Sequence, residues 1–77
     1  MNIGQEVGIE INNPKKWHIG AFAALNGKTG NVVEIKEYNK FDENNILVEF
    51  HTPAETWHSY QIPWTAAWFS EKDLILL

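Results

Sequence analysis

Cysteine and arginine are both missing from this 77-residue chain. Without cysteine, neither a disulfide framework nor a thiolate metal site can form, so the stability must come from packing. Long apolar runs are missing too, because the longest spans only residues 19–25, far short of what crosses a bilayer. The N-terminus lacks the basic and apolar regions of a signal peptide. These absences predict a cytoplasmic protein that makes no membrane contact.

Positive charge is scarce. The chain has six basic residues, all of them lysine, against ten acidic ones, and its net charge is −4. Nucleic-acid-binding proteins usually have a basic patch that displaces phosphate counterions, and arginine makes their commonest base contact. The composition therefore argues against nucleic acid as the partner. A cluster of Lys15, Lys16 and Lys28 beside Trp17 would still allow such contact, which we keep as an alternative.

Apolar side chains are plentiful by contrast. Hydrophobic residues make up 44% of the chain, which includes four Trp, two Tyr and four Phe. A chain this short buries a limited fraction of its surface, and its ordering entropy nearly cancels its apolar burial. Each large aromatic side chain can bury about 150–250 Å². The composition predicts one domain over residues 1–77, with a small core built from bulky side chains.

Alternating apolar residues predict three strands. The alternation places strands at 6–11 and 31–38 and a third strand from residue 46 onward, with the last two forming an antiparallel hairpin. Val32 replaces Val33 in the core if a bulge follows Gly30. The expected core consists of the apolar members of these strands: Val7, Ile9, Ile11, Val33, Ile35, Ile46, Val48 and Phe50.

Turn residues separate these strands. Asn12, Asn13 and Pro14 end the first strand, and residues 15–29 are predicted to form a long irregular loop. One helical turn over 21–25 is the alternative, although Gly20 and Gly27 lie close to it. Residues 27–30 form the turn into the second strand, and residues 41–45 are interpreted as a polar connection between the hairpin strands.

The last third of the chain has mixed signals. Residues 56–62 have a strand-like composition that Pro63 interrupts, so residues 52–64 could be a strand or a loop, and a short helix beginning at Pro63 is a further alternative. Residues 70–73 are predicted to form a single capped turn, with Ser70 and Asp73 placed to satisfy free amides. Residues 74–77 are predicted to be a final buried strand.

The order of these elements resembles small SH3-like barrels of bacteria and phages, with residues 68–74 similar to their closing stretch. Residues 7–13, together with Gly27, Gly30 and Glu34, are similar to the YorP-type prophage proteins, which have no assigned function. The resemblance implies an all-β, small SH3-like barrel of about five antiparallel strands, with a long first loop and a one-turn helix before the last strand. Residues 15–29 lack the acidic and aromatic pattern of peptide-binding eukaryotic SH3 domains, so binding of Pro-rich peptides is not implied.

Catalytic and cofactor signatures fail their spacing tests. Residues 27–29 are Gly-Lys-Thr, but a phosphate loop needs glycine where Phe22 stands. His58 and Ser59 are adjacent, and neighbours on a strand point to opposite faces. The histidines lack the i, i+4 spacing of a helical zinc site: His18, His51 and His58. We therefore predict no catalytic residue, no metal, no cofactor and no enzyme activity.

Aromatic density near residue 60 is the strongest anomaly. Five large rings lie within thirteen residues: Trp57, Tyr60, Trp64, Trp68 and Phe69. They could plug the core, because a small barrel needs bulky side chains. They could also stay exposed, since Trp and Tyr are enriched at protein interfaces. The hypothesis is a partner-binding surface made of these residues: Trp17, Trp57, Tyr60 and Trp64.

The sequence therefore favours a small interaction module that binds a protein or peptide through an aromatic-rich surface. The first alternative is a homo-oligomerising accessory protein of phage or prophage origin, because small open barrels expose edge strands. The second alternative is a nucleic-acid-associated SH3-like domain. The sequence does not identify the partner or the oligomeric state.

Overall fold

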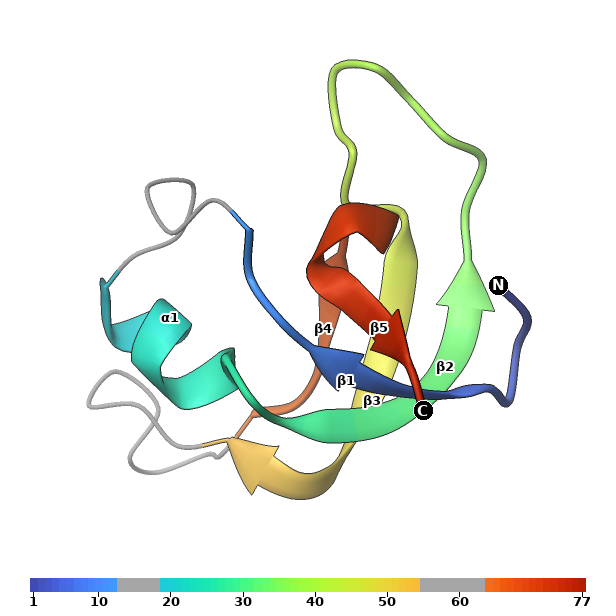
Figure 1. Ribbon diagram of the computed structural model, residues 1–77. Helices are drawn as coiled ribbons and strands as arrows, with labels where there is room; N and C mark the ends of the chain where they lie inside the picture. Colours follow the sequence, from blue (N-terminus) through green and yellow to red (C-terminus); the bar gives the residue numbers. More distant parts are fainter. Residues whose placement is uncertain (13–18, 55–63) are drawn as a thin grey trace.

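The sheet of this protein joins the two ends of the chain (Figure 1). The computed structural model describes residues 1–12, 19–54 and 64–77. Within them the strands follow the antiparallel order β4-β3-β2-β1-β5. The elements are β1 (Glu6–Ile9), α1 (Ile19–Leu25), β2 (Thr29–Ile35), β3 (Ile46–Ala54), β4 (Trp64–Phe69), the 3₁₀ helix η2 (Glu71–Asp73) and β5 (Leu74–Leu76). The predicted fold class, an all-β, small SH3-like barrel of five antiparallel strands with one helical turn before the last, is confirmed.

β1 joins the next strand in sequence to the last one, because it pairs with both β2 and β5. Val7 lies opposite Gly30 of β2 and opposite Leu76 of β5. Gly30 also lies opposite Phe50 of β3, and a Cβ atom there would lie 2.2 Å from the Glu49 carbonyl oxygen. Only glycine therefore lets β2 and β3 approach this closely at this position.

A β-bulge decides which face of β2 enters the core. The β2–β3 register shifts between Val32 and Glu34, so Val33 is the extra residue. Val32 is fully buried, whereas Val33 is 40% and Ile35 38% exposed. The expected core positions of Val33 and Ile35 are therefore wrong, and the alternative with Val32 in the core is confirmed.

The core contains residues of all five strands, together with Leu25 of α1. Phe50 and Phe69 meet edge to face in it, with ring centroids 6.2 Å apart and planes at 66°. The other predicted core residues, including Ile11 just beyond β1, are confirmed. The buried apolar set is Val7, Ile9, Ile11, Leu25, Val32, Ile46, Val48, Phe50, Ala54, Phe69 and Leu74.

The first long connection contains a helix, so the prediction of an irregular loop is wrong for part of it. Residues 19–25 form α1, whose Leu25 is fully buried. The helix ends where Gly27 adopts a φ of +87°, a conformation that glycine tolerates best, and Lys28 N–H donates to the Leu25 carbonyl over 3.1 Å. Gly27 N–H also donates to the Ile9 carbonyl over 2.8 Å, which fixes the end of α1 beside β1.

The predicted capped turn at 70–73 is confirmed as η2. Ser70 Oγ accepts from Lys72 N–H over 3.3 Å. The Asp73 side chain is buried and accepts from the backbone N–H of Asn12 over 3.0 Å, which holds the turn against the end of the first strand. The Asn12 side chain in turn donates to the Lys72 carbonyl.

The last strands differ from two expectations. Residues 64–69 form β4, paired with β3, so the alternative of a short helix beginning at Pro63 is wrong. Residues 52–54 continue β3, whereas 55–63 lie outside the described residues. In the predicted final buried strand only Leu74 is buried, because β5 forms an edge of the sheet.

Across residues 1–12, 19–54 and 64–77, no helix combines the length and the apolar character that crossing a membrane requires.

Candidate functional site

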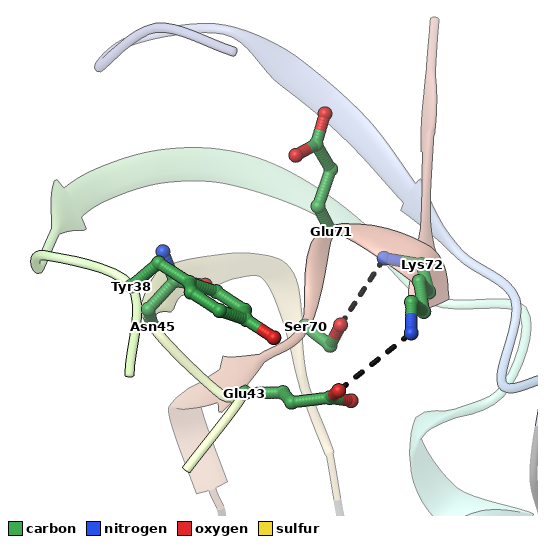
Figure 2. Close-up of a pocket in the computed structure, with 6 residues that line it drawn as sticks. All are labelled: Tyr38, Glu43, Asn45, Ser70, Glu71 and Lys72. Atoms are coloured by element: carbon green, nitrogen blue, oxygen red, sulfur yellow. Dashed lines mark hydrogen bonds and ion pairs between the residues drawn. The ribbon is translucent and has the colours of Figure 1, made fainter. Parts of the chain in front are cut away.

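A pocket of about 370 Å³ lies between the loop 36–45, which joins β2 to β3, and η2 (Figure 2). We call it the loop pocket. Figure 1 shows this loop extending well beyond the sheet. The pocket is therefore built from two segments that are far apart in sequence. Its lining residues are Tyr38, Glu43, Asn45, Ser70, Glu71 and Lys72.

Hydrogen bonds give the loop a defined shape at its base. Lys36 N–H donates to the Asn45 carbonyl over 2.8 Å, and the Asn45 side-chain amide donates back to the Lys36 carbonyl over 3.1 Å. The Lys36 ammonium lies 4.2 Å from the centroid of a Trp68 ring on β4, a cation–π distance. The base of the loop is thus tied to both the hairpin and the neighbouring strand.

The tip of the loop is a tight turn. Asp42 N–H donates to the Asn39 carbonyl over 3.0 Å, and the Asn39 side chain accepts from Phe41 N–H over 2.9 Å. Asp42 in turn accepts from Asn44 N–H over 3.1 Å. These bonds hold a loop in which Tyr38 is 62% and Phe41 87% exposed. Two large rings therefore stand in solvent on a hydrogen-bonded support.

One ion pair crosses the loop pocket. Glu43 Oε1 lies 3.6 Å from Lys72 Nζ, and the two side chains point toward each other in Figure 2. The Tyr38 ring lies across the pocket with its hydroxyl toward Ser70, whereas the Glu71 carboxylate points away from the ion pair. The lining therefore carries two carboxylates and one ammonium group.

Ser70 is the buried polar group of the loop pocket, with 5% of its surface exposed. Its oxygen accepts from Lys72 N–H, but among the residues that the structure describes, no acceptor takes its hydroxyl proton. Buried polar groups in native proteins are nearly always paired, so an unused donor beside a pocket marks a place for a ligand acceptor.

A second polar cluster lies on the exposed face of β1, β2 and β3. His51 Nδ1 lies 2.9 Å from Thr29 Oγ1, and His51 Nε2 lies 2.8 Å from Asn31 Oδ1 and 3.7 Å from Glu6 Oε2. The Asn31 amide nitrogen donates to the Gly4 carbonyl over 3.2 Å. Asn31 Oδ1 is therefore an acceptor, so neutral His51 donates from Nε2 and accepts the Thr29 hydroxyl proton at Nδ1.

The order of hydroxyl, imidazole and amide in this cluster resembles the relay of a nucleophilic hydrolase. Here it lies on an exposed sheet face, and its members belong to neighbouring strands. It therefore acts as a cross-strand polar ladder that adds to strand pairing. Sequence reasoning missed this ladder because Thr29 and His51 meet only through the β2–β3 register.

The structure describes one of the four residues predicted to bind a partner. Trp64 begins β4, where it is partly buried and packs against the core. The other three lie outside the described residues: Trp17, Trp57 and Tyr60. The four-residue surface therefore stays a prediction. His18 and His58 also lie outside, and no group of three or more metal-ligating side chains occurs in the described part of the chain.

Sequence reasoning also missed the loop pocket. Residues 41–45 were interpreted as a polar connection, and Tyr38 was assigned to the end of a strand. The available signal was the presence of Tyr38 and Phe41 in a stretch otherwise made of charged residues and asparagine. A large ring in such a stretch has no core to enter, which favours a binding role.

Comparison with models of known protein families, with curated proteins and with solved structures found no match to this chain.

Proposed function

We propose that this chain is a small binding module that holds a protein or peptide segment in the loop pocket. The observation that carries the proposal is the pairing of an exposed aromatic with a buried, unused donor: Tyr38 stands over the pocket and Ser70 lies in it. An apolar ring beside a few oriented polar groups is the usual composition of a ligand site. A peptide offers both partners, since its side chains pack on the ring and its carbonyls accept from the hydroxyl.

The predicted aromatic surface extends this proposal. Trp17, Trp57, Tyr60 and Trp64 would supply additional contact area for a larger partner, because aromatic side chains dominate interface energetics. Binding rather than catalysis is favoured, because the one relay-like cluster of the described residues lies on an open sheet face.

Display of a random peptide library on phage tests the proposal. Peptides selected on the wild-type protein should shift the backbone amide NMR signals of Tyr38, Ser70 and Lys72. Tyr38→Ala should weaken binding by about fivefold or more, since truncating an aromatic hot-spot residue costs more than about 1 kcal/mol. Ile3→Ala is the matched control, because Ile3 is 66% exposed and does not line the loop pocket. Selected peptides that shift none of these signals would contradict the proposal.

Self-association is a second candidate function, favoured by the exposed edge. β5 ends the sheet order, and the side chains that follow Leu74 are largely exposed: Ile75 46%, Leu76 62% and Leu77 60%. An apolar edge strand can pair with a second copy. Sedimentation velocity should then show a dimer that Leu76→Lys converts to monomer. A wild-type monomer at millimolar concentration would exclude this candidate.

Nucleic-acid contact has less support. All four lysines of the described residues are engaged within the chain. Lys28 Nζ donates to the carbonyls of Thr52 and Pro53. The other three contact an aromatic ring or a carboxylate: Lys36, Lys40 and Lys72. A phosphate ligand would have to break these contacts against a net charge of −4.

A further inference from the structure

We propose that the loop pocket selects an extended peptide segment that carries a lysine or arginine, and that Lys72 is the internal cation which this side chain displaces from Glu43. This inference rests on the proposed function and adds the chemical class of the ligand. It follows from three features of the loop pocket: the weakness of its ion pair, the excess of negative charge around it, and the apolar ring beside it.

The Glu43–Lys72 pair is suited to exchange. Its two charged atoms are 3.6 Å apart, and the side chains are 36% and 74% exposed. Such exposed pairs are weak, because solvent screens them and the long lysine side chain loses entropy when it is held. A ligand cation can therefore replace Lys72 at Glu43 at low cost. A ligand arginine would bind Glu43 more tightly than a ligand lysine, because its planar guanidinium binds a carboxylate through two parallel hydrogen bonds.

The charge around the loop pocket opposes the binding of an acidic peptide. Glu71 lines the pocket, and the same loop carries exposed Glu37 and Asp42. The two lysines of that loop are turned to aromatic rings, Lys36 to Trp68 and Lys40 to Phe41. Once Lys72 is displaced from Glu43, both carboxylates of the lining are without a cation partner, so an acidic peptide would meet repulsion and a basic one attraction.

The remaining contacts suit the stem and the backbone of a basic residue. The Tyr38 ring offers an apolar face to the methylene stem of lysine or arginine, and its π-face attracts the cation. Among the described residues, no acceptor takes the proton of the buried Ser70 hydroxyl, so a ligand carbonyl oxygen can accept it. One extended residue with a long cationic side chain could use all three groups: Glu43, Tyr38 and Ser70.

The probes are three capped pentapeptides that place arginine, glutamine or glutamate between pairs of alanines. Their binding to the full chain is followed by the amide NMR shifts of Tyr38, Ser70 and Lys72. The arginine peptide should bind about two- to fivefold more tightly than the glutamine peptide, and the glutamate peptide most weakly. This preference should shrink when the salt concentration is raised to about 0.5 M.

Two charge variants separate the roles of the pair. Lys72→Gln should tighten binding of the arginine peptide by about two- to fivefold, because Glu43 is then free. Glu43→Gln should abolish the preference for arginine over glutamine. The matched controls are Lys28→Gln and Glu49→Gln, which make the same charge changes away from the loop pocket and should leave the preference unchanged. The NMR spectrum of each unliganded variant verifies its fold.

Equal affinities for the three peptides, or a Lys72→Gln variant that binds the arginine peptide no more tightly than the wild type, would overturn the inference. So would the absence of any shift with all three peptides. The phage-display experiment decides the proposed function separately. Selected peptides that bind at the loop pocket without enrichment in lysine or arginine would leave the proposed function intact and refute the charge selection.

Discussion

Replacing Gly30 with alanine should destabilise the protein more than the same change at Gly4, Gly8 or Gly27, the other glycines whose surroundings the structure describes. The new Cβ would lie 2.2 Å from the Glu49 carbonyl oxygen and 2.8 Å from Val48 Cγ1. Ordinary contacts of this kind begin near 3.4 Å. The β3 backbone would therefore have to move by about 1 Å, which disrupts its hydrogen bonds to β2. Overpacking commonly lowers the free energy of unfolding by about 1–3 kcal/mol. The clashing Glu49 carbonyl belongs to the backbone and cannot rotate away as a side chain could, so we expect Gly30→Ala to cost about 3 kcal/mol or more.

That loss is a large part of the total stability. At roughly 0.05–0.15 kcal/mol per residue, a chain of this length has about 4–12 kcal/mol to lose. Urea unfolding followed by circular dichroism and Trp fluorescence measures the change. Gly27→Ala is the comparison. Apart from the adjacent residues, no heavy atom of the described chain lies within 4 Å of the Cβ atom that alanine would add, so only the φ of +87° at Gly27 opposes a side chain. Gly27→Ala should lower the free energy of unfolding by about 1–2 kcal/mol. A Gly30→Ala cost equal to or below that of Gly27→Ala would refute the steric argument.

Three further substitutions test the packing and the polar contacts. Val32→Ala should lower the free energy of unfolding by about 2 kcal/mol in urea unfolding, because it removes buried methyl groups. Val33→Ala on the bulge should lower it by under about 0.5 kcal/mol. Similar losses for the two variants would contradict the bulge. Asp73→Ala should cost about 1.5–3 kcal/mol, because the Asn12 amide loses a charged acceptor, and Asp73→Asn should cost less. His51→Ala should cost under about 1 kcal/mol by thermal melting, because the ladder is exposed; a larger loss would indicate a buried role.

The strands could be predicted because their signal is local. Alternation in the 7–11 and 46–50 stretches identifies one buried face each, and both faces are buried as expected. The bulge at Val33 is not local in this sense, since it depends on how β2 pairs with β3. Both valines are β-branched and equally apolar, so the residues themselves cannot show which one turns inward. The alternation alone therefore assigned Val33 and Ile35 to the wrong side.

α1 was predicted only as an alternative turn over 21–25, and the loop pocket was not predicted, because each depends on tertiary contacts. An isolated seven-residue helix is unstable in water, and α1 exists because Leu25 is buried and Gly27 is fixed to β1. The loop pocket requires that η2 be brought beside Tyr38 from the far end of the chain. The individual pieces were visible, since the capped turn at 70–73 was predicted, but their meeting was not.

The double pairing of β1 also constrains the order in which the protein folds. Val7 lies opposite Leu76, so β1 cannot complete its pairing until β5, the last strand of the described chain, has reached it. Contacts between residues so distant in sequence carry a high loop-closure entropy and slow folding. A chain in which only β2 and β3 have paired has formed a local hairpin but has not completed the sheet. The pairing of β1 with β5 should therefore form late in folding, after the β2–β3 hairpin.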